Sequence, residues 1–386
     1  MSANPSSETY TRALKVGQEV AAQHAGSVDT EARFPHEAFA ALREAGLLGA
    51  MVPTELGGHG ASLEDIADAC FALGQSCAST AMIYAMHQIQ VACLVRHGLG
   101  VPELREYSAR LAKEQLLLAS ATTEVGIGGD VRSSLCSVER KGDTFRIEKQ
   151  APVISYAEHC DDILVTGRRA PDAPSSDQVI CLVPRREATL EKIGTWDTLG
   201  MRGTCSLGFK VSYEGPAWRV VPQPYAEMSA QTMLPTSHIT WTSLWLGNAT
   251  DAVAKARASV RAEARKKPGT VPPSALRLAE TVAALQKMRG TVRDARAEYA
   301  ASMNDPLELS SMGFAIRMNN LKICASEQQV DVVARALQVC GIFGYKNDTK
   351  YSVGRNLRDA YGAALMVAND RIYSANASML LVHKDD

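Results

Sequence analysis

The clearest place for chemistry in this sequence is a glycine-rich segment from Thr122 to Val131, Thr-Thr-Glu-Val-Gly-Ile-Gly-Gly-Asp-Val. It follows a predicted strand. Because glycine has no Cβ, the backbone N–H groups of such a loop can approach an anionic or carbonyl-rich ligand closely. Standing alone, the same pattern is more typical of an ordinary turn, so the surrounding elements must decide between a ligand site and a turn.

The elements before this loop are predicted to be helices. Small and apolar residues recur at helical spacing at Ala38, Leu42 and Ala45. Ser62 is predicted to cap the next helix, because Asp65 three residues later can complete a capping box. A long apolar stretch then runs from Ile66 to about Leu94, and the segment 74–80 is expected to split it into two helices.

The residue pattern changes near Leu118, where short segments rich in β-branched residues alternate with turn residues. They predict antiparallel strands that form a small barrel or sandwich. From about Met233 the sequence returns to long amphipathic helices, which predict a four-helix bundle. The expected fold class is therefore α+β, with an N-terminal helical domain at 1–118, a middle β-domain at 119–228 and a C-terminal helical bundle at 229–386.

Composition limits the function classes of the 386-residue chain. Its formal net charge is -1 and it has no long basic run, which argues against a nucleic-acid partner. No apolar run reaches the ~18 residues of a membrane helix, and the polar N-terminus has no signal-peptide core. The nine cysteines form no CxxC pair, so reduced thiols, a cytoplasmic location and no metal site are expected.

Five separated blocks resemble the acyl-CoA dehydrogenase family, in the family's order, over roughly residues 30–380. The glycine-rich loop is similar to the family signature Thr-Glu-Pro-Gly-x-Gly-Ser-Asp. The others are Leu-Arg-Glu-Ala-Gly-Leu-Leu-Gly in the first domain, Val153–Ser155 in place of Trp-Ile-Thr, Leu199–Gly203, and a C-terminal stretch that contains Gln338, Gly341, Arg358 and Asp359.

The resemblance implies an FAD cofactor held between the β-domain and the two helical blocks. The residues that it places against FAD are Thr122, Thr123, Gly128, Gly129, Val153, Ser155, Arg265, Gln338, Gly341 and Asn369. In the family, the arginine that aligns with Arg265 and the loop that aligns with Gln338 and Gly341 contact FAD across a subunit interface. A guanidinium fork suits a pyrophosphate, so Arg265 is chemically apt for this role.

The reaction of the family needs a carboxylate base, and neither usual position holds one here. The family abstracts a proton next to a thioester carbonyl, while a hydride leaves the adjacent carbon for the flavin. Val367 stands at the usual glutamate position, and Ser237 stands at the alternative one. His238 replaces the arginine usual beside that second position, which opens the possibility of an acyl-carrier protein in place of CoA.

Other residues could supply the base, and each also has a structural interpretation. The candidates for the base are His238, His87, Asp370, Glu124 and Tyr156. His238 and Asp370 come first, because an imidazole titrates near ~6.5 and a carboxylate is a natural base. His238 could equally pack at a helix start, and Asp370 could pair with Arg371. Among the alternatives, Glu124 is more typical of a structural partner. The expected substrate contacts are His87, Gly129, Tyr156, His238 and Val367, although His87 could be a core histidine and Tyr156 a pocket wall.

Four functions remain open at this point. The first is α,β-dehydrogenation of an acyl thioester with a non-standard base. The second is a monooxygenase that uses reduced flavin and O2. The third is a partner subunit of a mixed complex that lacks a base, and the fourth is a flavin-binding structural protein. The resemblance also implies a homotetramer, a dimer of dimers, and the electron acceptor is not indicated.

Overall fold

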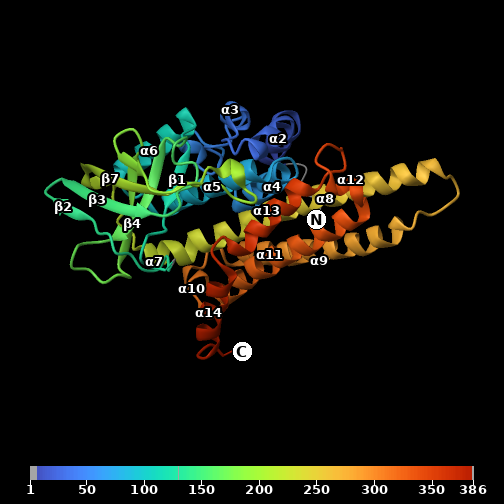
Figure 1. Ribbon diagram of the computed structural model, residues 1–386. Coiled ribbons are helices and arrows are strands. Elements are labelled where there is room, and N and C mark those ends of the chain that lie inside the picture. The colour runs from blue at the N-terminus through green and yellow to red at the C-terminus, as the bar shows by residue number, and fades with distance from the viewer. Residues whose placement is uncertain (1–6, 129, 385–386) are drawn as a thin grey trace.

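The computed structural model describes residues 7–128 and 130–384 and has three parts (Figure 1). The N-terminal part is helical, because its apolar residues recur at helical spacing and meet in one core. The capping box predicted at Ser62 and Asp65 is confirmed, with Asp65 N–H donating to Ser62 Oγ at 3.2 Å. The elements are α1 (Glu8–Val16), η1 (Gly17–Ala21), α2 (Ala22–Thr30), α3 (His36–Glu44), η2 (Thr54–Leu56), α4 (Leu63–Gly74), α5 (Ala78–His97) and α6 (Pro102–Glu114).

Helix α5 corrects one sequence-based expectation. By length and composition alone it is long and apolar enough to cross a membrane. The apolar run in the sequence is interrupted by His87, Gln88 and Gln90, so counting uninterrupted apolar residues missed it. In the structure 89% of the 18-residue stretch that is this apolar is buried inside the protein. The polar side chains are buried too, and Gln88 donates to the carbonyl oxygen of Leu47 at 2.8 Å. This burial is the pattern of a core helix.

The middle part is a β-sandwich of two sheets rather than a closed barrel. One sheet has the order β1-β4-β5 and the other has the order β2-β3-β7-β6. Most neighbours are antiparallel as predicted, but β1 pairs with β4 in parallel, because β2 and β3 lie between them in sequence but belong to the other sheet. The strands are β1 (Leu118–Ala121), β2 (Glu139–Lys141), β3 (Thr144–Ala151), β4 (Asp162–Arg168), β5 (Gln178–Pro184), β6 (Thr189–Lys192) and β7 (Phe209–Pro216), with η3 (Arg202–Thr204) and η4 (Ala217–Arg219).

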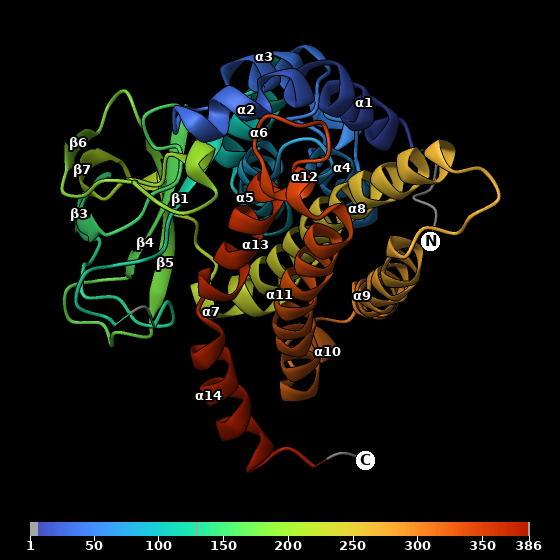
Figure 2. The ribbon, with the colours of Figure 1, turned by 45° about the vertical axis from the view of Figure 1, so that its right-hand side comes forward.

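The C-terminal part is a bundle in which α8, α9 and α11 run side by side and α13 packs on α11 (Figures 1 and 2). The last helix, α14, projects from the body in both views. The limits of the three domains at residues 118 and 228 stay predictions. The elements are α7 (Tyr225–Met228), η5 (Ser229–Met233), α8 (Leu234–Lys266), α9 (Ser274–Ser302), α10 (Pro306–Leu309), α11 (Met312–Cys340), α12 (Ile342–Tyr345), α13 (Gly354–Leu365) and α14 (Asn369–Leu380).

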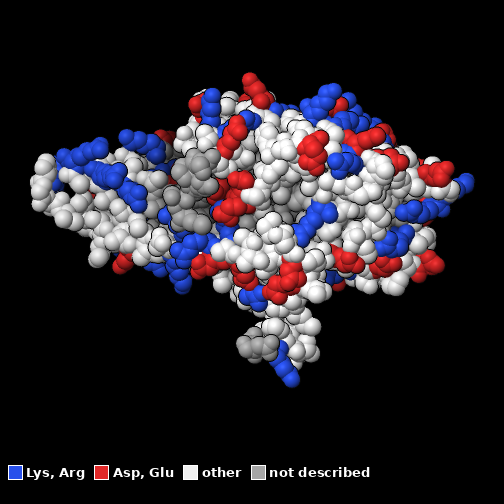
Figure 3. All heavy atoms as spheres, turned by 180° about the vertical axis from the view of Figure 1, so that it is seen from behind, with Lys and Arg blue, Asp and Glu red and all other residues white. Residues whose placement is uncertain are grey.

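The surface charge is mixed. On the face in Figure 3, acidic and basic side chains are interspersed over most of the body, and basic side chains gather over the α8–α9 hairpin. The turn of that hairpin begins with Arg265, Lys266 and Lys267. All nine cysteines are free thiols, and six of them, such as Cys70, are buried. No group of three metal-ligating side chains occurs in residues 7–128 and 130–384.

Candidate active site

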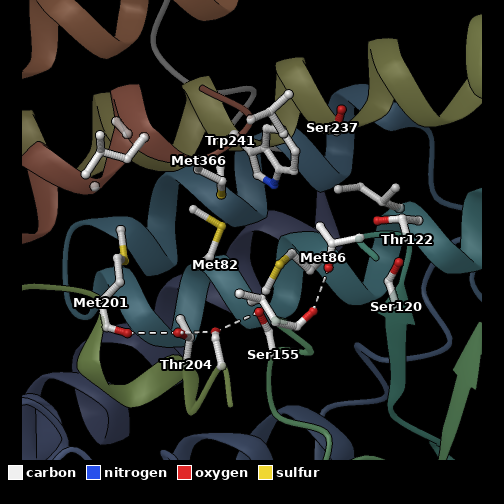
Figure 4. A pocket seen from close by; sticks show the side chains of 18 of the residues that line it. Met82, Met86, Ser120, Thr122, Ser155, Met201, Thr204, Ser237, Trp241 and Met366 are labelled. Atoms are coloured by element: carbon white, nitrogen blue, oxygen red, sulfur yellow. Dashed lines mark hydrogen bonds between the residues drawn. The ribbon is translucent and has the colours of Figure 1, made fainter. Parts of the chain in front are cut away.

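A pocket of about 640 Å³ lies where the three parts meet. This volume is in the ordinary range for a small-molecule site. The β-domain forms one side with Ser120, Thr122, Ser155 and Ser206. Helices form the other side, and Figure 4 shows Met82 and Met86 from α5, Trp241 from α8 and Met366 from the turn before α14 projecting toward a common space.

The β-domain side carries a chain of hydroxyl groups whose direction can be worked out. Ser155 and Ser206 are joined at 2.7 Å between their Oγ atoms, and Ser206 and Thr204 are joined at 2.8 Å. Thr204 Oγ1 lies 2.8 Å from the carbonyl oxygen of Met201, an atom that can only accept (Figure 4). Two oxygens this close need a hydrogen between them.

The hydroxyl of Thr204 must therefore donate to Met201, since no other hydrogen is available between those two atoms. Thr204 then cannot donate to Ser206, so Ser206 donates to Thr204. By the same reasoning Ser155 donates to Ser206. The hydrogen of Ser155 is thus directed into the protein, and the lone pairs of its oxygen are available to the pocket.

Backbone hydrogen bonds hold this hydroxyl chain in place. Ile154 N–H donates to the carbonyl oxygen of Leu207, and Tyr156 N–H donates to that of Thr204, each at 2.8 Å. These two bonds bring residues 153–156 alongside 204–207. Tyr156 adopts a φ of 43°, which turns the chain away after Ser155. Local backbone pairing therefore explains why two segments about 50 residues apart in sequence share one wall.

The helical side is apolar with a few polar groups at fixed places. Ser237, His238 and Trp241 come from the first turns of α8 and line the pocket. Ser237 Oγ donates to the carbonyl oxygen of Leu234 at 2.8 Å, so its hydrogen is used within the helix. Burial lowers the pKa of His238 to about 4, and the nearby Lys322 ammonium acts in the same direction. The imidazole of His238 is therefore neutral at physiological pH.

Val367 lines the pocket in an unusual backbone conformation. Its φ is 49°, in the left-handed region that β-branched residues rarely adopt. Lys322 holds this turn, because its Nζ donates to the carbonyl oxygen of Val367 at 3.2 Å and to Asn369 Oδ1 at 2.7 Å. Burial lowers the pKa of Lys322 to about 8. The apolar side chain at the family's base position is thus held by a defined network.

The structure brings some of the predicted site residues together and separates others. Those that line the pocket are Thr122, Thr123, Val153, Ser155, Ser237, His238 and Val367. Those that lie outside its lining are His87, Tyr156, Gly128, Arg265, Gln338, Gly341, Asn369 and Asp370. Gly129 lies outside the described residues.

The predicted substrate roles of His87 and Tyr156 need correction. His87 is fully buried, with Nε2 2.8 Å from the carbonyl oxygen of Leu48 and Nδ1 accepting from Leu118 N–H at 3.0 Å. Tyr156 donates from its hydroxyl to the carbonyl oxygen of Leu118 at 2.7 Å. Both side chains therefore tie α5 and the segment after β3 to the start of β1, and neither lines the pocket.

Asp370 and Glu124 also have other surroundings. Asp370 is exposed on the first turn of α14, and no ion pair with Arg371 is recorded within the described part of the chain. Glu124 is buried against Lys149 at 3.5 Å and accepts from Cys136 N–H at 2.7 Å. These hydrogen bonds and the lysine lower the pKa of Glu124 despite its burial. Glu124 therefore supports the glycine-rich loop as an ionised structural partner.

Asn369, Arg265 and Gln338 do not meet the pocket of their own chain. The amide of Asn369 is used internally, by Lys322 and by Ser326 Oγ at 3.1 Å. Arg265 lies 27 residues beyond His238 on the same helix, a separation of about 40 Å at the helical rise. Arg265 and Gln338 are both exposed. A cofactor contact by these two residues would need a second subunit, and that role stays a prediction.

The sequence-based reasoning missed the residues that make most of the helical wall. Met233 at the end of η5 and Trp241 and Trp245 on α8 lie at intervals of four from Ser237, the one of them that the sequence had indicated, and share its face. Met82 and Met86 repeat the same spacing on α5. This periodicity was a readable signal, but it does not distinguish a pocket wall from a packed core.

The comparisons with known proteins agree with this arrangement. The family models described as acyl-CoA dehydrogenase N-terminal domain and C-terminal domain match residues 8–115 and 229–366. Cyclohex-1-ene-1-carbonyl-CoA dehydrogenase of Geobacter metallireducens is 27% identical over 88% of each chain. Amino sugar nitrososynthase DnmZ of Streptomyces peucetius is 26% identical over 88% of this chain and 84% of its own.

A solved structure has the same fold. The FMN-bound TdsC from Paenibacillus sp. A11-2 superposes with a TM-score of 0.83, covers 97% of this chain and 98% of its own, and is 20% identical. TdsC of this organism is a dibenzothiophene monooxygenase. Similar chains thus include a thioester dehydrogenase and flavin enzymes with other reactions.

Proposed function

Since the chain belongs to the acyl-CoA dehydrogenase family and is a flavoenzyme of that type, we propose that it is a monooxygenase that uses reduced flavin and O2. The observation that carries the proposal is the chemistry of the pocket lining. Within the described residues, no Asp or Glu lines the pocket, and the two usual base positions are Val367 and Ser237. Abstraction of an α-proton therefore has no carboxylate, whereas oxygenation needs none.

His238 does not replace the missing carboxylate base. A base must hold the proton that it removes, and an imidazole whose pKa is lowered to about 4 binds a proton weakly at neutral pH. Its Nδ1 faces the carbonyl oxygen of Met318 at 3.0 Å, so this nitrogen must carry the hydrogen and donate it. His238 is then suited to accept a hydrogen bond in a neutral pocket rather than to drive carbanion formation.

The pocket fits a flavin ring, with hydroxyls on one side and thioether and aliphatic groups on the other. Thr122, Thr123 and Ser155 would hold its polar edge, and the small side chain of Val153 leaves one face uncovered. The inward-directed hydrogen of Ser155 leaves an acceptor, which suits a reduced ring because that ring carries an N–H absent from the oxidised one. When bound, reduced flavin supplies two electrons to O2, so that one oxygen atom enters the substrate and the other leaves as water.

The helical wall would exclude water from this reaction. Met82, Met86 and Met366 present polarisable, flexible thioethers that adapt to an apolar ring. Excluding water favours oxygen transfer to substrate over loss of the oxygen as peroxide. We propose FAD as the flavin and a homotetramer as the assembly, because Arg265 and Gln338 match family positions and only a neighbouring subunit can bring them to the pocket.

The decisive experiment compares oxygen insertion with dehydrogenation. The protein is loaded with FAD or FMN and supplied with an NAD(P)H-dependent flavin reductase, ¹⁸O2 and indole or dibenzothiophene, and the products are measured by mass spectrometry. We expect one ¹⁸O atom in the product only when reductase and O2 are both present. In parallel, cyclohex-1-ene-1-carbonyl-CoA and butyryl-CoA are added anaerobically to the oxidised protein. Bleaching of the flavin by either thioester would overturn the proposal in favour of a dehydrogenase.

The hypothesis that the chain is a partner subunit of a mixed complex predicts a different result. It predicts neither labelled product nor bleaching, together with flavin binding that strengthens only when a second polypeptide is added. Chromatography of the flavin released from the purified protein tests FAD directly. Light scattering tests the assembly, and a mass near that of one chain would remove the cross-subunit roles of Arg265 and Gln338.

A further inference from the structure

Trp241 places an unpaired hydrogen-bond donor in the pocket. Its side chain is 8% exposed, and its indole N–H has no partner among the residues that the structure describes. In Figure 4 the nitrogen lies on the edge of the indole that points toward Met82. Trp245, which also lines the pocket, likewise has an indole N–H without a partner among the described residues. A buried donor without a partner is unfavourable, so it calls for an explanation. By contrast, Trp196 at the same pocket donates to the carbonyl oxygen of Met201 at 3.2 Å.

His238 places an unpaired acceptor beside it. Because Nδ1 donates to the carbonyl oxygen of Met318, the neutral ring has a bare lone pair on Nε2. No hydrogen bond to Nε2 is recorded within residues 7–128 and 130–384, and the ring lines the pocket at 4% exposure. The charged group that acts on this ring is Lys322, whose positive charge opposes protonation of the imidazole.

The rings that carry the donor and the acceptor are neighbours on one helix. Trp241 follows His238 by three residues on α8, and their ring centroids lie 5.9 Å apart with an interplanar angle of 41°. Rings this close leave room for one polar group to contact both, each through a hydrogen bond of about 2.9 Å. The labelled neighbours Met82, Met86 and Met366 carry thioethers, which have no hydrogen for the imidazole and are only weak acceptors for the indole N–H.

We propose that Trp241 and His238 together bind the hydroxyl group of a neutral, otherwise apolar ring compound. A hydroxyl accepts from the indole N–H and donates to the imidazole, and it satisfies both. A thioester carbonyl only accepts and would leave His238 unpaired, and an ammonium group only donates. A carboxylate has no hydrogen for the imidazole. The inference rests on the proposed function for the location of the substrate beside the flavin.

The first test uses the flavin-loaded protein and three ligands that share a naphthalene ring. 2-Naphthol can donate and accept, 2-methoxynaphthalene can only accept, and naphthalene can do neither. Binding is measured at neutral pH by titration calorimetry and by the change in the flavin absorption spectrum. We expect 2-naphthol to bind about tenfold more tightly than 2-methoxynaphthalene, the value of one well-made hydrogen bond to a buried group. Equal affinity for these two ligands would overturn the proposal.

Two variants assign the preference to its residues. Trp241→Phe keeps an aromatic ring and removes the N–H. His238→Asn can keep the bond to Met318 through its amide and removes the acceptor at Nε2. Each is expected to weaken 2-naphthol binding about tenfold and to change naphthalene binding less than about twofold. Trp218→Phe is the matched control, because Trp218 lies outside the pocket lining, and it should leave all three affinities unchanged.

The outcomes separate this inference from the proposed function. If 2-naphthol is preferred and both variants remove the preference, the recognition pair holds even when no oxygenated product is found. If ¹⁸O is incorporated but the ligands bind equally, the oxygenase stands and the recognition pair is wrong. The wild-type ligand series needs no variant, so the proposal stays testable even if Trp241→Phe or His238→Asn does not fold.

Discussion

The two sides of the pocket differ in how much of the family pattern they retain. The β-domain side is built from the glycine-rich loop and from Ser155, which follow the family blocks, and its hydroxyls form one directed chain. The helical side departs from the family at Ser237, His238 and Val367. Among the described residues, the indole N–H groups of Trp241 and Trp245 and the Nε2 atom of His238 have no partners there. The hydroxyl groups of the β-domain side thus have hydrogen-bond partners without a ligand, whereas the polar groups of the helical side gain partners only when a ligand binds.

This difference separates the cofactor from the substrate. Hydrogen-bonding groups that are already satisfied and directed suit a resident molecule of constant shape, such as a flavin ring. Groups that lack partners in an apolar wall suit a molecule that comes and goes, because each arrival restores their hydrogen bonds. The family resemblance therefore predicts the flavin well, while the chemistry of the helical wall determines which substrate and which reaction follow.

Changing the contact that joins the two sides, called the seam here, should have the largest effect on the free energy of unfolding. Leu199–Gly203 docks on the start of α13, where Met201 N–H donates to Asp359 Oδ1 at 2.7 Å. A Cβ on Gly200 would overlap the carbonyl oxygen of Arg358 and would lie 2.6 Å from the backbone nitrogen of Asp359. Since backbone cannot yield locally, Gly200→Ala is expected to lower the free energy of unfolding by about 3 kcal/mol. Chemical denaturation measures it.

A matched glycine provides the control for this prediction. Gly290 lies within α9, and a Cβ there would meet nothing within 4 Å. Gly290→Ala should therefore raise the free energy of unfolding by about 0.5–1 kcal/mol, through helix propensity. If Gly200→Ala proves as stable as wild type, the seam is not a fixed contact and the two sides are free to separate.

Breaking the hydroxyl chain should have an intermediate effect. Thr204→Val removes the donor to Met201 and the acceptor for Ser206, so the hydrogen of Ser155 is no longer forced inward. The preference of the site for reduced over oxidised flavin is expected to fall about tenfold. For a two-electron couple this equals a decrease of about 30 mV in the midpoint potential of the bound flavin. Spectroelectrochemical titration measures the change.

Thr198→Val is the control for the hydroxyl chain. Thr198 lines the same pocket, but its Oγ1 donates to the carbonyl oxygen of Gly200 at 3.0 Å and takes no part in the chain. The midpoint potential of the flavin bound to Thr198→Val should stay within about 5 mV of that in the wild type. An unchanged potential in Thr204→Val would mean that the direction of the Ser155 hydroxyl does not matter to the flavin.

The smallest effect is expected at the turn where the helical side departs from the family. Val367 adopts a φ of 49°, which asparagine tolerates better than a β-branched residue. Val367→Asn should raise the free energy of unfolding by about 1 kcal/mol in thermal or denaturant unfolding. Val131 lines the same pocket without a positive φ, so Val131→Asn should bring no such gain. Equal behaviour of the two variants would remove the strain argument.

Some features could be predicted because they depend on neighbouring residues. The capping box at Ser62 and Asp65 and the break between α4 and α5 follow from local side-chain and backbone chemistry. The strand segments and the long helices follow from periodicity. The pairing of β1 with β4 could not be read this way, since strand order depends on contacts between distant segments. The domain limits and the subunit assembly stay predictions.

Individual side-chain roles were harder to predict, and two histidines show why. His87 and His238 both lie in apolar helical runs, and burial lowers the pKa of each to about 4. His87 has both ring nitrogens occupied by backbone groups of Leu48 and Leu118, whereas His238 has only one occupied. The sequences around them do not reveal this difference, because the partner groups come from elements 31 to 80 residues away.

The sequence by itself determined the family, the order of helical and β-domains and the absence of a carboxylate at Val367 and Ser237, because these are properties of residue identity and spacing. Only the tertiary structure decided the inward direction of the Ser155 hydroxyl and the pairing of Trp241 with His238. Both depend on which hydrogen-bonding groups have a partner atom within about 3 Å and which have none, a matter that folding sets and sequence separation does not.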